Sequence, residues 1–377
     1  MSDSTTVPPL PKNKPNRWPL TFATIFLVPV LTALIVYHYE SFDPAELPVH
    51  EIVGRPTVAA PRVNSRMLDG SERVGEGKLP GPEDIAYDHE SGLIYTGCND
   101  GWVKRVRVND STVEEWVNTG GRPLGVVLSR QGELIVADTE KGLLRVSQSG
   151  SVELLTDEAE GVKFKLTDGV DVAEDGIIYF TDASYKYRFE EHIWDILEGR
   201  PYGRFMSFDP KNRRTNILVR DLYFANGVAV SPKQDFVVFC ETILSRCLRY
   251  YISGKKNGTV DKFIELLPGV PDNIRYDGEG HFWIALSTEV SLSWQWALKY
   301  PVIRKGLAIM EKYLKRPHME KNGGVFVVDL KGNPIAHYYD PRLSFLSGAA
   351  KIGNYLYCGS IAVPYITRLD LTLHGAQ

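Results

Sequence analysis

The sequence repeats one short pattern six times, and this repetition constrains the fold more than any other feature. Each copy begins at a residue that is usually polar or small, continues as an alternating apolar strand, turns, and returns as a second apolar strand. Repeats of roughly 40–50 residues with several strands each indicate the blades of a β-propeller. The copies begin at Glu83, Leu124, Asp168, Asn226, Asp272 and Ser347.

Six such copies predict an all-β, six-bladed β-propeller over residues 76–377, with four short strands in each blade. An ordinary β-sandwich does not account for one motif that recurs six times. The copies are unequally spaced, which indicates insertions in the connecting loops. Residues 40–75 contain prolines and polar residues without clear periodicity, so we predict a linker there.

The largest insertion lies in the fifth blade, between Ser287 and Asn322. Its middle part has helical spacing, because apolar residues recur at steps of four, three and four among lysines and arginines. These residues are Ile303, Leu307, Met310 and Leu314. Three interpretations remain open: a lid over one face of the propeller, a basic amphipathic element on a membrane, or a helix pair packed on the blade edge.

The N-terminal region contains 20 consecutive uncharged residues, "WPLTFATIFLVPVLTALIVY", from Trp18 to Tyr37. A helix of about 20 apolar residues spans a bilayer. Basic residues precede this stretch and acidic residues follow it, so the positive-inside rule predicts a cytosolic tail at 1–17 and a transmembrane signal anchor at 18–39. The competing interpretation is a cleaved signal peptide, whose apolar region is normally only about 7–15 residues long.

This topology places the propeller in the secretory pathway, facing a lumen or the outside. The final compartment would be the endoplasmic reticulum, the vacuole or the cell surface. Two sequons, at Asn109 and Asn257, are then predicted glycosylation sites. Cys240 and Cys247 flank a predicted hairpin turn, and they either form a disulfide or remain as buried thiols.

The charge pattern excludes one class of partner. The chain has a net charge of −4 and contains no long basic run or basic stripe. Proteins that bind nucleic acids normally carry such a basic footprint. We therefore expect a small-molecule substrate, and membrane contact through residues 18–39. The sequence does not predict the oligomeric state.

The first residues of the six copies suggest a metal site. Equivalent positions of the blades are related by rotation about the propeller axis, so these side chains converge in the central channel. A single Asp or Asn before a strand often only caps a turn. Four oxygen-bearing residues in register instead predict a shared Ca²⁺ site, because Ca²⁺ prefers a large and irregular set of oxygen ligands. The predicted ligands are Glu83, Asp168, Asn226 and Asp272, with Asn273 as a fifth oxygen donor.

The segments "IIYFTD", "FANGVAVS" and "PDNIR", in this order, resemble the strictosidine synthase-like family. The resemblance extends over about residues 75–371 and includes the N-terminal anchor of membrane-bound members. It also implies kinship with the adipocyte plasma membrane-associated protein and, more distantly, with calcium-dependent paraoxonases and gluconolactonases. In those calcium-dependent relatives the axial metal ligands are Glu, Asn, Asn and Asp. These positions fall on Glu83, Asp168, Asn226 and Asp272, with Asp168 replacing an Asn.

Two catalytic positions that the resemblance implies are lost in this chain. The synthase uses a glutamate on the last blade for its amine–aldehyde condensation, and that position is Ser347 here. Paraoxonase-like enzymes have a histidine on the second blade, and that position is Leu124. Neither a hydroxyl nor an aliphatic side chain can carry the required proton near neutral pH.

These observations favour a calcium-dependent hydrolase of an ester or lactone that lacks strictosidine synthase activity. The ion would polarise the carbonyl group of the substrate. Without the histidine, the catalytic base would be a carboxylate of the ring: Asp168, Glu83 or Asp272. Two alternatives stay open, namely a non-catalytic binding propeller with a structural metal and an amine–aldehyde condensing enzyme.

Overall fold

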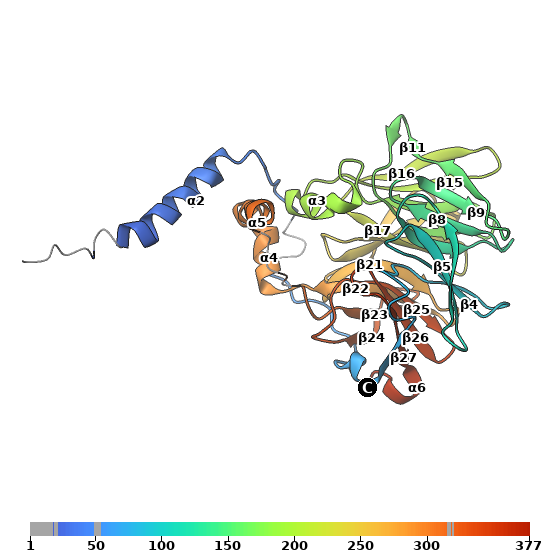
Figure 1. Ribbon diagram of the computed structural model, residues 1–377. Helices are drawn as coiled ribbons and strands as arrows, with labels where there is room; N and C mark the ends of the chain where they lie inside the picture. Colours follow the sequence, from blue (N-terminus) through green and yellow to red (C-terminus); the bar gives the residue numbers. More distant parts are fainter. Residues whose placement is uncertain (1–17, 19–21, 49–53, 315–317, 319) are drawn as a thin grey trace, which may run out of the picture.

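Six sheets stand around a central axis and form the six-bladed β-propeller that the repeats predict (Figure 1). The computed structural model describes residues 18, 22–48, 54–314, 318 and 320–377. Each copy of the sequence motif supplies the first two strands of one blade, and from blade 1 to blade 6 the first strand of each blade contacts that of the next around the axis. The predicted four-stranded blade is confirmed, with one further strand in the fifth blade.

The blades follow one another along the chain. Blade 1 comprises β3 (Ala86–Asp88), β4 (Leu93–Gly97), β5 (Trp102–Arg107) and β6 (Val113–Asn118). Blade 2 comprises β7 (Pro123–Leu128), β8 (Leu134–Asp138), β9 (Gly142–Val146) and β10 (Val152–Thr156). Blade 3 comprises β13 (Thr167–Val172), β14 (Ile178–Asp182), β15 (Gly203–Asp209) and β16 (Arg214–Leu222). A small hairpin, β11 (Glu158–Ala159) and β12 (Val162–Lys163), precedes blade 3.

Blade 4 comprises β17 (Ala225–Val230), β18 (Phe236–Glu241), β19 (Arg246–Tyr251) and β20 (Val260–Ile264). Blade 5 comprises β21 (Gly269–Tyr276), β22 (His281–Glu289), β23 (Gly324–Asp329) and β24 (Pro334–Tyr339). Blade 6 begins with β25 (Leu346–Ile352), β26 (Tyr355–Ser360) and β27 (Ile366–Asp370). Cys240 on β18 and Cys247 on β19 are cross-strand partners and form a disulfide.

The ring is closed by a strand from before blade 1. β2 (Ser71–Val74) pairs with β27 as the outermost strand of blade 6, and β1 (Arg62–Asn64) adds to blade 5 beside β24. The predicted boundary at residue 76 is therefore too late, because part of the predicted linker 40–75 belongs to the propeller. These strands are too short to show a period-two pattern in the sequence.

The hydrophobic core is divided among the interfaces between blades. Each of the six interfaces holds its own cluster of buried aliphatic and aromatic side chains, contributed by the two facing sheets. This arrangement explains the alternating pattern of each repeat, since both faces of a blade pack on a neighbour. A seventh cluster lies over one face of the ring, where Leu47 and Leu298 pack on Leu124 and Phe224.

Three helices cover that face of the propeller (Figure 1). α3 (His192–Glu198) lies between β14 and β15, directly after the short helix η4 (Phe189–Glu191). α4 (Leu292–Lys299) and α5 (Pro301–Tyr313), here called the lid helices, form the insertion between β22 and β23. Three short helices lie elsewhere: η3 (Met67–Gly70), η5 (Gly254–Lys256) and α6 (Leu371–His374).

The apolar N-terminal stretch is helical where it is described, as η1 (Ala23–Leu27) followed by α2 (Val28–Tyr39). Its side chains are largely exposed, and α2 extends away from the propeller (Figure 1). Residues 1–17 and 19–21 of the predicted tail and anchor lie outside the described residues. Within the described residues, no helix meets the length and hydropathy that a membrane span requires.

Candidate metal centre

The strands that begin the blades carry a β-bulge at the start of the motif. In β7, β13, β17 and β21 the antiparallel register with the next strand is interrupted at the first two motif residues. A bulge bends a strand and redirects a side chain from its regular alternation. The first motif residues Leu124, Asp168, Asn226 and Asp272 thereby line one cavity at the axis, together with Glu83 from just before β3.

Glycine at the second motif position lets the blades approach closely. A Cβ atom at Gly125, Gly169 or Gly227 would lie within 2.7 Å of the carbonyl oxygen of the first motif residue in the next blade. Gly348 stands in the same relation to Glu83, across the junction of blades 6 and 1. Only a residue without a side chain fits at such a distance.

Four side chains form what we call the axial cluster: Glu83, Asp168, Asn226 and Asp272. The carboxylate oxygens of Glu83, Asp168 and Asp272 lie within 4.8 Å of one another. Glu83, Asp168 and Asn226 are almost completely buried. Asn226 Oδ1 and Glu83 Oε2 have no hydrogen-bond partner among the described residues. The predicted convergence of these residues at the axis is therefore present.

The electrostatics of the axial cluster are unfavourable without a cation. None of its three carboxylates forms an ion pair in the described part of the chain. Burial, with repulsion from Asp272 and Asp84 added, raises the pKa of both Glu83 and Asp168 well above the usual range. Burial also raises the pKa of Asp272 to about 7, although the side chains of Ser287 and Asn226 lower it. Such a group is stable in its ionised form when a cation compensates it.

The axial cluster fits Ca²⁺ by its donor set. All the inward atoms are carboxylate and carboxamide oxygens, with no thiolate or imidazole among the first motif residues, and two of them are buried without a partner. Such oxygen donors suit a hard cation. Ca²⁺ accepts 6–8 oxygens in an irregular arrangement, and water or substrate would complete the set.

Asn273 differs from its prediction as a fifth oxygen donor. Its Nδ2 donates a hydrogen bond to Glu83 Oε1 at 2.6 Å, so it presents a donor rather than an acceptor to the cluster. The bulge in β21 leaves Asp272 and Asn273 outside the regular pairing, and both turn toward the axis. Asn273 thus holds Glu83 in position.

A buried ion pair lies close to the axial cluster in the channel. Arg275 donates to both oxygens of Asp84, and to the carbonyls of Val170 and Val126 at 3.0 and 2.6 Å. Asp84 also accepts from the backbone amide of Val126 at 3.0 Å. Arg275 compensates Asp84, so the uncompensated charge is that of the axial cluster.

A cavity of about 180 Å³ opens above the axial cluster. Its floor is acidic, whereas its walls are mainly aliphatic and aromatic side chains from the blades, α3 and the lid helices. Trp294 of α4 and Leu307 of α5 reach this cavity. The lid helices therefore cover the face above the axial cluster, which is the lid arrangement among the three interpretations.

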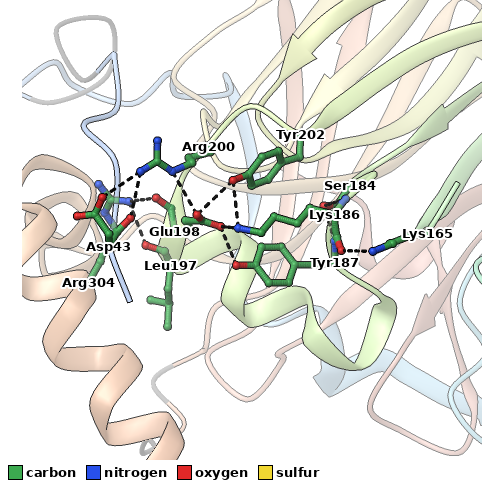
Figure 2. A network of polar contacts seen from close by, with 10 residues as sticks. All are labelled: Asp43, Lys165, Ser184, Lys186, Tyr187, Leu197, Glu198, Arg200, Tyr202 and Arg304. Atoms are coloured by element: carbon green, nitrogen blue, oxygen red, sulfur yellow. Dashed lines mark hydrogen bonds and ion pairs between the residues drawn. The ribbon is translucent and has the colours of Figure 1, made fainter. Parts of the chain in front are cut away.

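The helical face of α5 differs from the predicted one. Arg304 and Ala308 are its buried residues, whereas Ile303 and Leu307 are only half-buried and Leu314 is exposed. The Arg304 guanidinium donates to backbone carbonyls, including those of Leu197 and Glu198 at 3.1 and 3.0 Å (Figure 2). A buried arginine that caps the end of another helix is not visible in an apolar pattern.

A polar network secures α3 beside the cavity (Figure 2). Glu198 accepts from Lys186 at 2.6 Å, from Tyr187 at 2.7 Å and from Arg200 at 3.2 Å. Burial opposes the ionisation of Glu198, but these donors outweigh it and lower the pKa of the carboxyl. Arg200 also reaches Asp43 at 3.1 Å, which ties the segment after α2 to this wall.

The two positions that the resemblance marks as lost carry no acid or base. Leu124 contributes an apolar contact to the cavity wall. Ser347 is fully buried, and its Oγ donates to the backbone carbonyl of Glu83 at 2.8 Å. The Ser347 hydroxyl therefore joins blades 6 and 1.

The cavity wall also contains three titratable residues that the sequence did not single out: His192, Glu289 and Glu320. His192, the first residue of α3, lines the cavity, and its Nδ1 lies 2.7 Å from the Phe189 carbonyl oxygen. A carbonyl only accepts, so Nδ1 carries the proton in the neutral ring and Nε2 is the basic nitrogen. The sequence signal was weak because His192 lies outside the repeated motif.

Two solved structures share this propeller fold. A gluconolactonase from Xanthomonas campestris superposes with a TM-score of 0.59 at 18% identity, covering 84% of this chain and 99% of that one. A calcium-binding protein, regucalcin, from Agrobacterium tumefaciens superposes with a TM-score of 0.54 at 16% identity, covering 83% and 95%. The chain therefore has the propeller fold of the gluconolactonase and regucalcin type, with an acidic cluster at its axis.

Sequence relatives then define the family. Residues 63–106 match the profile described as strictosidine synthase-like, N-terminal, and residues 168–255 match that of strictosidine synthase. The protein strictosidine synthase-like 4 of Arabidopsis thaliana is 54% identical over 95% of this chain and 99% of its own length. The adipocyte plasma membrane-associated protein of Rattus norvegicus is 30% identical over 93% and 98%. This chain belongs to the strictosidine synthase-like family.

Proposed function

We propose that this chain is a calcium-dependent hydrolase that cleaves an ester or lactone in the cavity above the axial cluster. The observation that carries the proposal is a group of three carboxylates within 4.8 Å of one another, two buried and one partly buried, without ion-pair partners among the described residues, at the floor of an apolar cavity. A bound Ca²⁺ would supply Lewis-acid polarisation of the carbonyl and stabilisation of the oxyanion. The reaction consumes one water and yields an acid and an alcohol, or one hydroxy acid from a lactone.

The residues of the chain have distinct roles in this proposal. Glu83, Asp168, Asn226 and Asp272 hold the ion, and Asn273 orients Glu83. The apolar walls bind the hydrocarbon part of the substrate and exclude bulk water. His192 Nε2 joins Asp168 and Glu83 as a candidate to accept the proton of the attacking water, since all three line the cavity.

Hydrolysis of a phenyl acetate and of a simple lactone by the full chain tests the proposal. We expect turnover with calcium, loss of turnover with a chelator, and loss in Asp272→Ala. Asp175→Ala is the matched control, because Asp175 is an exposed turn residue on the same type of blade hairpin. His192→Gln separates the candidate bases: a loss of kcat with retained calcium binding assigns the base to His192.

The absence of any turnover, in a chain that still binds calcium, would contradict the hydrolase proposal. That result would favour a binding propeller with a structural metal, which the apolar Leu124 at a catalytic position also supports. An amine–aldehyde condensing enzyme would need an acid at Ser347. We expect Ser347→Ala to keep full activity, and to lose only about 1 kcal/mol of stability with the hydrogen bond to Glu83.

We further propose that residues 18–39 anchor the chain in a membrane and that the propeller faces a lumen or the outside. The uncharged stretch and its flanking charges support this topology. The sequon residues Asn109 and Asn257 are exposed, and the disulfide between Cys240 and Cys247 suits an oxidising compartment. A glycosidase-sensitive mass shift that disappears in Asn109→Gln/Asn257→Gln tests it, and an unglycosylated, carbonate-extractable chain would contradict it.

A further inference from the structure

The outer surface of the lid helices is unusually apolar. Leu292 is 73% exposed, Trp296 is 60% exposed and Val302 is 57% exposed. Tyr300, between the two helices, and Tyr313, at the end of α5, are also exposed. A helix on the surface of a soluble domain normally presents polar side chains to water. This surface therefore has the composition of an interaction site.

The inner surface of the same helices is already in use. Ala297, Leu298 and Ala308 are buried, while Trp294 and Leu307 line the cavity. The exposed apolar residues thus do not contribute to the fold of the propeller. They are free to contact a second apolar phase.

The lid helices adjoin the apolar helix α2. Lys305 Nζ lies 4.9 Å from the ring centroid of Tyr37, and Lys312 Nζ lies 2.9 Å from Glu40 Oε2. Figure 1 shows α4 and α5 on the side of the propeller from which α2 extends. The exposed apolar side chains of the lid helices and of α2 therefore lie on the same side of the molecule.

The chemistry of the surface fits a lipid bilayer better than a second copy of this acidic chain. Between Leu292 and Tyr313 the residues Lys299, Lys305 and Lys312 and one acidic residue, Glu311, are at least partly exposed, in a chain of net charge −4, whereas Arg304 is buried. Tryptophan and tyrosine with flanking lysines are typical of the region between lipid headgroups and acyl chains.

We propose that the lid helices lie on the membrane that α2 enters, with Leu292, Trp296 and Val302 inserted among the lipids, and that the cavity receives its ester or lactone from that membrane. The part of this proposal that concerns substrate delivery rests on the proposed hydrolase function. The apolar walls of the cavity accommodate a hydrocarbon chain, and the acidic floor places the metal at its polar end. An amphipathic substrate dissolved in the bilayer matches both features, since its hydrocarbon chain fits the apolar walls and its carbonyl group reaches the metal.

Depth measurement on the full chain in vesicles tests the surface independently of activity. A nitroxide label is attached to the cysteine of the Val302→Cys variant, and the labelled chain is placed in vesicles of phosphatidylcholine and phosphatidylglycerol. Cys98 and Cys358 are buried, and the other two cysteines are bonded. The control is Leu154→Cys, on the outer strand β10 of blade 2, where Leu154 is 47% exposed.

We expect oxygen to reach the label at position 302 and a soluble nickel complex not to reach it, whereas the complex reaches the label at position 154. A label at 302 that the nickel complex reaches equally would overturn the proposal. A label that neither reagent reaches would also overturn it, because protein, such as a second copy of the chain, would then cover this surface.

Two substrates then separate the failure of this proposal from that of the hydrolase function. Leu292→Ser/Trp296→Ser should lower turnover of a long-chain ester in vesicles about tenfold, from the lost apolar transfer energy. Turnover of soluble phenyl acetate should stay unchanged, since neither residue lines the cavity. Equal turnover of the long-chain ester in variant and parent would overturn the delivery step. No turnover of either ester by the parent chain would instead refute the hydrolase function and with it substrate delivery, while the nitroxide result still decides the membrane surface.

Discussion

At the level of single residues, the carboxylates of the axial cluster repel one another, and a bound cation would compensate their charge. Asp272 is partly buried, and burial of its carboxyl group raises its pKa to about 7. We predict that Asp272→Asn has opposite effects in two buffers. In a chelator it should raise the melting temperature, because one buried carboxylate is removed. In calcium it should reduce the stabilisation by about 1.4 kcal/mol for each tenfold loss of affinity.

Thermal unfolding in the two buffers checks this sign reversal. Asp175→Asn serves as the control, because it changes the same chemical group at an exposed turn. A variant that loses stability equally in calcium and in chelator would contradict a metal role for Asp272.

The glycines at the second motif position give another prediction at this scale. Gly227→Ala should destabilise the fold by about 1–3 kcal/mol, since the new Cβ would lie 2.6 Å from the Asp272 carbonyl oxygen and from the Asn273 Cα. Gly306→Ala is the matched control in α5, where nothing lies within 4 Å and alanine favours the helix by about 0.5–1 kcal/mol. Urea unfolding measures both, and equal stability of the two variants would refute the close packing at the axis.

At the level of secondary-structure elements, α3 contains a carboxyl group, that of Asp195, whose buried surroundings disfavour its ionised form. Asp195 is fully buried, and neither of its oxygens has a well-formed hydrogen bond among the described residues. Burial raises the pKa of Asp195 to about 7, the nearby Ser184 hydroxyl lowers it, Glu198 and Asp182 raise it, and Lys186 lowers it.

The raised pKa of Asp195 predicts how stability depends on pH. Between about pH 4 and pH 7 the folded chain retains a proton that the unfolded chain has lost, so its contribution to stability falls as the pH rises. Asp195→Asn should therefore be more stable than the parent at pH 8, by at most about 4 kcal/mol, and the difference should vanish near pH 4. Urea unfolding over this pH range provides the measurement, and a difference independent of pH would contradict it.

The elements also show which features the sequence could reveal. The six strand pairs were predictable because each blade packs on both faces and repeats the same alternation. The closing strand β2 could not be predicted, because its four residues, Ser71–Val74, are too few to show an alternation of apolar and polar side chains. The helical spacing of apolar residues predicted the lid helices. The buried face of α5 was predicted wrongly, because Arg304 is buried where it donates to carbonyl groups of α3.

At the scale of the whole molecule, the axial cluster depends on ring closure. Glu83 precedes blade 1 and Asp272 belongs to blade 5, so their proximity is set by the number and packing of the blades. The repeat made this convergence predictable from sequence. His192 was not predictable, because it comes from an inserted helix outside the repeat, and neither was the orientation of Asn273, which depends on the bulge in β21.

Calcium titration of the full chain by calorimetry tests whether the axial cluster is a metal centre. We predict one ion bound per chain, weaker binding of magnesium, and loss of calcium binding in Asp272→Ala but not in Asp175→Ala. A correctly folded chain that binds no calcium, or that binds it equally after Asp272→Ala, would contradict the assignment of the axial cluster as the metal centre.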